Sequence, residues 1–268
     1  MKYQPKQLGQ NHNVSHENPL KEFFTLLLGA SVLFVAFVIA TGFFVDRAVA
    51  YINPELEARL FNNAMLEAFA SEFESGDQEQ QLREEELQSM LDQLGVCIDV
   101  GYPVRLRLMK SEELNAFAYP GGSIVVLSAL ADTLKTENGM AFVLAHELAH
   151  FKNRDHLRGM GRSLVILAAS VAVTGVNSGL SSLLTPALGL DSAQFSQGRE
   201  SDADATALHA LHCYAGNVRD ATEFFDHMKQ QEALDDWSAI HYFSSHPEVG
   251  QRIKKIRALA EESGYQQD

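Results

Sequence analysis

The residues HELAH, 146–150, constrain the fold of this chain more than any other feature of its sequence. On an α-helix, residues four apart lie on the same face, so the imidazoles of His146 and His150 can bind one metal ion while Glu147 leans over it. Zinc hydrolases use this arrangement, with an open metal position for water and the glutamate as general base. The pattern predicts His146 and His150 as metal ligands and Glu147 as a catalytic residue.

The residues around this motif predict a buried helix. Thr136 is suitably placed to cap the N-terminus of the helix, and apolar residues occur on nearly all sides of it. They are Met140, Phe142, Val143, Leu144, Leu148 and Phe151. Buried polar groups cost free energy unless something satisfies them, so two histidines and a glutamate here favour a bound metal. The alternative is a helix whose histidines hydrogen-bond to neighbouring carbonyl groups.

A third metal ligand is expected from the segment GRESDADATALHAL. Glu200 and Asp204 are four residues apart and share a helical face with apolar residues. We assign Glu200 to the metal and Asp204 to a supporting role, in which its carboxylate accepts the other N–H of His146 or His150. Asp202 points away and is expected in solvent. The alternative is that Glu200 and Asp204 are surface acids near a helix N-terminus, where the helix dipole favours them.

Residues 23–45 carry no charge and predict a transmembrane helix. As a helix they would rise about 34 Å, which is enough for a hydrocarbon core of about 30 Å. A cleaved secretory signal is the alternative, because Ala48-Val49-Ala50 resembles a cleavage site, but the apolar region of a signal is usually shorter. Basic residues slightly favour a cytoplasmic N-terminus. In a Gram-negative bacterium this orientation predicts a single-pass protein of the inner (cytoplasmic) membrane with a periplasmic catalytic domain.

A second apolar stretch, residues 163–190, lies between the histidine pair and Glu200. A single crossing here would put the ligands on opposite sides of the membrane, and there is barely length for two spans of about 20 residues. We therefore favour a helical hairpin that covers the active site or dips into the membrane interface, with a true crossing as the alternative.

Residues 54–94 are predicted to be helical and acidic, with a break at 75–77. Leu56 begins an apolar stripe that we expect to be buried, and Gly95 is expected to end the second helix. The glutamates of this region are predicted to form a solvated face without a chemical role.

Between residues 96 and 126 the periodicity changes to that of strands. Residues 96–100 and 103–110 alternate, and Pro120-Gly121-Gly122 predicts a turn between strands at Asn115–Ala118 and Ser123–Leu127. A short helix is expected from Ser128. This is an ordinary hairpin, or an edge near Asn115–Leu127 that binds a peptide substrate as an added strand.

The formal charge of −14 argues against a nucleic-acid partner, because binding to phosphates requires a basic face. The two cysteines, Cys97 and Cys213, form no metal or redox motif. A disulfide and two buried thiols both remain open, since the sequence does not give their distance.

Several motifs together resemble the HtpX-like family of zinc endopeptidases, which includes the CAAX prenyl proteases and a mitochondrial inner-membrane stress protease. These are NAFAYPGG, VLAHELAH followed by NRDH, the ExxxD pair of Glu200 and Asp204, and SSHPEVGQRI, in the family's order over residues 54–260. The resemblance implies a zincin-type domain of the gluzincin kind with one Zn²⁺ per chain, held by two histidines and a glutamate. It also implies cleavage of misfolded or membrane-associated proteins.

In the family the tract His246-Pro247 with Arg252 recurs near the active site. His246 is therefore a candidate catalytic residue that donates to the oxyanion, or a reversible extra zinc ligand. The alternative is an ordinary loop before a helix. His156 lies six residues beyond His150, a spacing that fits no common short metal motif, and we give it no partner and no role.

The predicted fold class is mainly α with a small β-sheet (α+β), behind one transmembrane helix. The expected organisation is a polar tail at 1–20, an anchor at 21–47, a zinc metallopeptidase domain at 54–260 with the cover at 163–190, and a tail at 261–268. The predicted function is that of a membrane-anchored zinc endopeptidase in protein quality control, with membrane lipid and protein substrates as partners. The alternative is a membrane-tethered chaperone or assembly factor, although structural zinc sites usually have four protein ligands.

Overall fold

The structure is a computed structural model that describes residues 18–61, 78–162, 165, 197–232, 246 and 249–267. The polar tail up to residue 17 and, apart from residue 165, the expected cover at 163–190 lie outside the described residues. The chain forms two compact units, residues 1–44 and 45–268, which are treated separately below.

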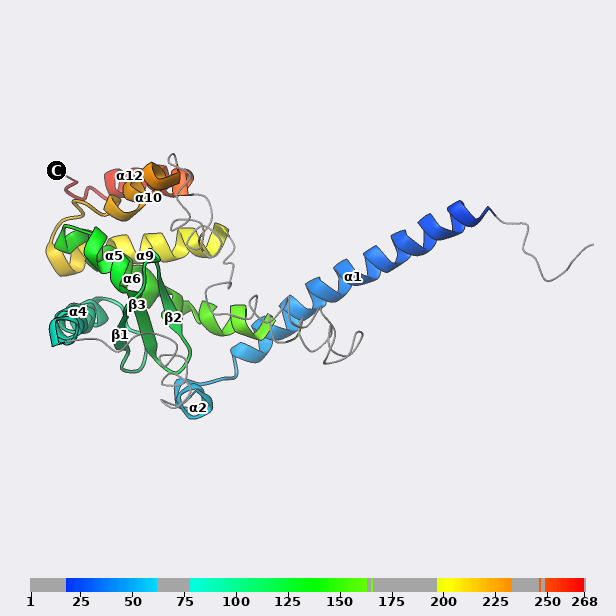
Figure 1. Cartoon of the computed structure of the whole chain (residues 1–268), viewed down its shortest axis with the longest axis horizontal. Helices are drawn as coiled ribbons and strands as arrows, with labels where there is room; N and C mark the ends of the chain where they lie inside the picture. The colour runs from blue at the N-terminus through cyan, green and yellow to red at the C-terminus, as the bar shows by residue number, and fades with distance from the viewer. Residues whose placement is uncertain are drawn as a thin grey trace, which may run out of the picture. The chain divides into compact units, whose positions relative to one another are not determined.

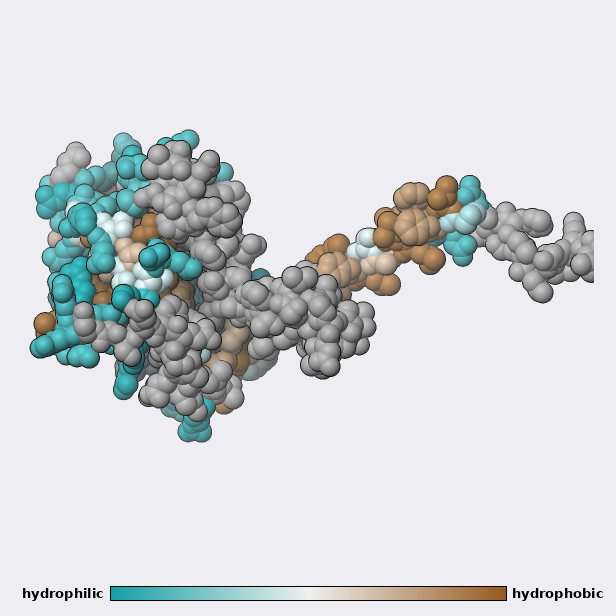
Figure 2. Space-filling view, viewed as in Figure 1, coloured by the Kyte–Doolittle hydropathy of each residue, from teal (hydrophilic) through white to brown (hydrophobic). Residues whose placement is uncertain are grey.

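The first unit consists of most of helix α1, Pro19–Val49. At 1.5 Å per residue this helix is about 46 Å long. It is long and apolar enough to cross a membrane, and it is the one such helix among the described residues. Its large apolar side chains between Leu20 and Phe44 include many that are exposed, and Figure 2 shows apolar residues of this helix in brown, giving way to hydrophilic residues at the N-terminal end.

The second unit is mostly helical with one small sheet, which confirms the predicted α+β class. Its elements follow α1 in this order: α2 Pro54–Leu60, α4 Gln78–Cys97, β1 Arg105–Met109, β2 Ala116–Tyr119, β3 Ser123–Leu127, α5 Ser128–Thr133, α6 Glu137–Asn153, α9 Gln197–Ala215, α10 Glu223–Glu232 and α12 Val249–Glu262.

The sheet has the strand order β1-β3-β2. β2 and β3 form the predicted antiparallel hairpin, with Ala118 opposite Ile124, and β1 pairs with β3 in parallel. Alternation in β1 places Leu106 and Leu108 in the core and leaves two arginines exposed, as the sequence pattern predicted. Because β2 stands at the end of the strand order, it is an edge strand of the sheet that the described residues form.

One hydrophobic core joins the sheet to the helices. α4 packs on β1, while α6 packs on β2 and lies against α9; α12 packs on α9, and α10 packs on α12. In the view of Figure 1, α9 lies above the sheet, and α10 and α12 lie above α9. α6 is thus enclosed on several sides, as its all-round apolar sequence predicted.

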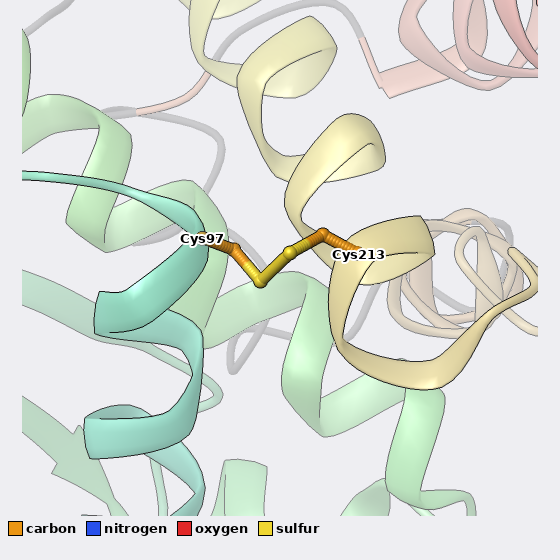
Figure 3. Close-up of a disulfide and its surroundings, with 2 residues drawn as sticks. All are labelled: Cys97 and Cys213. Atoms are coloured by element: carbon orange, nitrogen blue, oxygen red, sulfur yellow. A yellow bond between two sulfur atoms is a disulfide. The ribbon is translucent and has the colours of Figure 1, made fainter.

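A disulfide joins the end of α4 to α9. Cys97 and Cys213 have Cα atoms 6.0 Å apart and enclose a sequence separation of 116 residues (Figure 3). Their pairing settles the alternative that the sequence left open.

Three local predictions are wrong. Residues 96–100 are not a strand, because α4 continues through Gly95 to Cys97, and Ile98 N still donates to Leu94 O at 2.9 Å. The helix does not stop at Gly95, since Cys97 is held by the disulfide and Ile98 lies in the core. On α2, Leu56 is 41% exposed, whereas the neighbouring Glu57 is fully buried.

Candidate metal centre

The candidate centre is built on α6, the helix that carries HELAH. Thr136 caps it as predicted, because its Oγ1 accepts from Gly139 N at 3.0 Å. Every residue from Gly139 to Phe151 is buried. The helix ends at Arg154, whose backbone is left-handed (φ 59°). The centre therefore occupies a rigid helix in the interior of the second unit.

Four side chains from three segments converge on one point. The Nε2 atoms of His146 and His150 lie 3.0 Å apart. Glu200 on α9 brings its two carboxylate oxygens to 3.4 Å from His150 Nε2 and 3.6 Å from His146 Nε2. His246 joins them, and the four potential ligand atoms all lie within 4.8 Å of one another. The structure thus brings together the three predicted ligands and the candidate His246.

Each of the two predicted ligand histidines has a carboxylate beside its Nδ1 atom. Asp204 Oδ1 lies 3.1 Å from His146 Nδ1, and Asp155 Oδ2 lies 3.1 Å from His150 Nδ1. A carboxylate at Nδ1 places the proton there and leaves the Nε2 lone pair free for a metal. The role predicted for Asp204 agrees with this contact, whereas Asp155 was missed, although an acid shortly after the second histidine was a usable signal.

Arg252 on α12 neutralises part of this acidic cluster. It is buried, with its guanidinium 2.6 Å from Glu200 Oε2 and two contacts of 2.7 and 2.8 Å to the Asp204 carboxylate. The guanidinium also stacks over the Phe225 ring at 4.5 Å. Glu200 and Asp204 are 1% and 4% exposed, so they are not surface acids at a helix terminus. Asp202 is exposed, as predicted.

The charge of the cluster fits a cation. Burial would raise the pKa of the Glu200 carboxyl, but the imidazoles of His246, His146 and His150 outweigh it and hold that pKa well below its usual range. Burial would lower the pKa of His150, but Asp155 and Glu200 outweigh it and raise the pKa to about 10. The surroundings therefore favour positive charge at this point.

The donor set also fits zinc. Glu200 Oε1 is buried and accepts no hydrogen bond from the described residues, a cost that a bound cation would remove. Imidazole nitrogen and carboxylate oxygen are ligands that zinc binds readily, and three protein ligands are typical of a catalytic zinc site. The residues of the cluster therefore have the ligand atoms that a catalytic zinc site requires.

Glu147 and His246 border the cluster. Glu147 is 2% exposed, and its Oε1 lies 3.9 Å from His246 Nε2. His246 Nδ1 lies 2.9 Å from Glu200 Oε2. His246 is therefore buried at the centre and is not an ordinary loop residue.

A charged network links the centre to the last turn of α1. The buried Asp155 lies 3.5 Å from Arg199 and 3.4 Å from Arg158. Both arginines approach Asp46 in that last turn, and Arg162 binds Asp46 through two contacts of 2.8 Å.

The expectation that His156 has no partner is wrong. Its Nε2 lies 2.8 Å from Glu57 Oε1, and both side chains are buried. The expectation that the glutamates of residues 54–94 form only a solvated face is wrong for Glu57.

Comparison with known proteins identifies relatives. The model of peptidase family M48 matches residues 81–260. The metalloproteases LoiP and YcaL of Escherichia coli (strain K12) are 28% and 29% identical over 162 and 163 residues, which cover 59% of this chain and 63% and 62% of theirs. A protease HtpX homolog of Desulfatibacillum aliphaticivorans is 29% identical over 206 residues, 62% of this chain and 66% of its own. This chain thus spans somewhat less than two thirds of the length of LoiP and YcaL.

Proposed function

We propose, because this chain belongs to peptidase family M48, that it is a membrane-anchored zinc endopeptidase that cleaves misfolded or membrane-associated proteins. The observation that carries this proposal is the convergence of His146, His150 and Glu200 beside Glu147, in a buried cluster that favours a cation. The metalloproteases LoiP and YcaL, to which this chain is similar, support the same reaction class.

His146, His150 and Glu200 would hold the zinc. Bound there, zinc would supply a Lewis acid that polarises the scissile carbonyl and makes water more acidic. Asp204 and Asp155 would keep the two imidazoles in the tautomer that leaves Nε2 free. Arg252 would keep Glu200 and Asp204 ionised and fixed in position.

Glu147 would move the proton. Its carboxylate accepts a proton from the attacking water and later donates it to the amine nitrogen that leaves. His246 would have one of two roles: it would donate a hydrogen bond to the developing oxyanion, or it would be an extra ligand of the metal. The 2.9 Å contact from its Nδ1 to Glu200 supports the ligand role in this conformation.

The substrate would bind as an added strand on β2. This strand lies at one end of the strand order in the described sheet and packs on α6, which carries Glu147. A peptide that pairs through its main-chain hydrogen bonds can have many different sequences. This mode of binding therefore suits a protease whose substrates are recognised because they are unfolded. Helix α1 would anchor the enzyme in the inner membrane, with the second unit in the periplasm.

The test uses the full chain in detergent, with wild type beside Glu147→Gln. We expect both to carry one zinc, and the variant to cleave casein about 10²–10⁴-fold more slowly, which is the range for losing a general base. Glu137→Gln on the same helix is the matched control and should cleave within about twofold of wild type, because its contact to Tyr214 lies outside the cluster.

Cleavage by Glu147→Gln at the wild-type rate would remove Glu147 from its role. Zinc in both proteins with cleavage by neither would refute the peptidase and favour the membrane-tethered chaperone.

A further inference from the structure

We propose that Glu57 is a positioning residue that sets the spacing between the substrate edge β2 and the metal helix α6. This inference rests on the proposed function, because it assumes that peptide substrates bind along β2.

Glu57 lies on α2, outside the metal cluster. Asn53 caps this short helix by accepting from Leu56 N at 2.7 Å, and the Glu57 side chain is fully buried. Burial of a carboxylate is costly unless it is ionised and completely hydrogen-bonded. Its surroundings therefore need to supply several donors.

Four donors from three parts of the chain surround the Glu57 carboxylate. His156 Nε2 at 2.8 Å, Gly121 N at 3.0 Å and the Tyr102 hydroxyl at 3.2 Å donate to Oε1. Arg154 Nη2 donates to Oε2 at 2.8 Å. Burial would raise the pKa of Glu57, but His156, Gly121 and Arg154 outweigh it and lower that pKa. The carboxylate is thus a charged hub.

One side of the hub is the turn that carries the substrate edge. Gly121 lies between the end of β2 and the start of β3, with φ +91°. A Cβ at Gly121 would overlap the carbonyl oxygen of Phe61, so the end of α2 packs directly on this turn. β3 is the described strand that pairs with β2, and the turn that joins the two strands therefore fixes where the outer edge of β2 lies.

The other side of the hub is the chain just beyond the metal helix. Arg154 is the left-handed residue that ends α6, and its N–H donates to carbonyl groups of the last turn, including that of His150. The ring of His156 packs against Phe151 at 4.4 Å. Glu57 therefore holds the end of the helix and the tip of the hairpin through one carboxylate.

Glu57→Gln keeps the shape of the side chain but removes its charge. Whichever way the amide lies, its NH₂ faces the Gly121 N–H or the Arg154 guanidinium, which only donate, so at least one contact is lost. None of the four donors is a predicted metal ligand. Zinc binding should survive, while the β2 edge becomes free to shift relative to α6.

Two peptide substrates separate this effect from a loss of stability. A ten-residue peptide spans the whole edge, and a three-residue reporter covers only the scissile bond. For Glu57→Gln we expect unchanged zinc, a KM raised about tenfold for the long peptide, and kcat/KM for the reporter within about twofold of wild type. Tyr102→Phe removes one donor and should raise the KM for the long peptide by a smaller factor; it carries the test if Glu57→Gln does not fold.

Met228→Ala on α10 is the stability control, because it opens a cavity in the core far from the turn in sequence. A purely destabilising change lowers the active fraction, so kcat falls equally for both substrates and KM stays constant. The same pattern in Glu57→Gln would overturn the inference and leave the proposed function standing. Wild type that cleaves neither substrate would overturn the proposed function and this inference with it.

Discussion

Removing the disulfide should destabilise the second unit strongly. Replacing Cys97 and Cys213 by serine frees a loop that the bond closes across a separation of 116 residues. The chain-entropy relation for a loop of this length gives about 16 cal/mol/K, or about 4.8 kcal/mol at 25 °C. Cys213 is exposed and Cys97 is half-buried, so the serines themselves add little cost.

The assay is thermal unfolding followed by circular dichroism, with the full chain in detergent. A loss of about 4.8 kcal/mol should lower the midpoint by roughly 10–19 °C at 2–4 °C per kcal/mol. Oxidised wild type is compared with the double variant and with wild type in reductant, and the last two should coincide. A double variant that melts within about 2 °C of oxidised wild type would refute the loop-entropy reasoning, because residual order in the reduced chain would then already supply the constraint.

Four further predictions concern the centre and its support. Asp155→Asn should weaken zinc binding by about 10–100-fold, measured by competition with a chelator, because His150 loses the carboxylate that fixes its tautomer. Glu200→Gln should lose zinc on dialysis, and unchanged zinc content would refute its assignment as a ligand. Leu144→Ala should cost about 2–5 kcal/mol in urea unfolding, since this side chain is fully buried on α6. The stability advantage of wild type over Glu57→Gln should be fully present above the ordinary pKa of 4.5 and be lost as pH falls through the lowered folded-state pKa. An advantage that stays constant down to pH 3 would contradict a lowered pKa of Glu57 in the folded protein.

The parts of the site that follow from local sequence were predictable. The HELAH spacing gives a helix with both histidines on one face, and Pro120-Gly121-Gly122 gives the hairpin. The place of Glu200 in the cluster was predictable because a catalytic zinc site needs a third ligand and the helix of Glu200 offered a carboxylate.

The errors arise where distant contacts override a local pattern. Glu57 stands among acidic neighbours in sequence, and its partners Tyr102, Gly121, Arg154 and His156 lie 45 to 99 residues away. Residues 96–100 alternate like a strand, but the disulfide and the core hold Cys97 and Ile98 at the end of a helix. The periodicity of a sequence reflects local structure, so it does not predict the long-range contacts of Glu57 or the disulfide of Cys97.

The Asp46 carboxylate in the last turn of α1 decides where a soluble fragment of this protein should begin. A fragment that starts at residue 51 removes Asp46 from Arg162 and Val49 from the core. Arg158 and Arg199 would then face Asp155 without their second acid, and Arg162 would lose its contacts to Asp46. Low activity of such a fragment would not describe the intact enzyme, whereas a fragment that begins ahead of Val45 keeps both contacts.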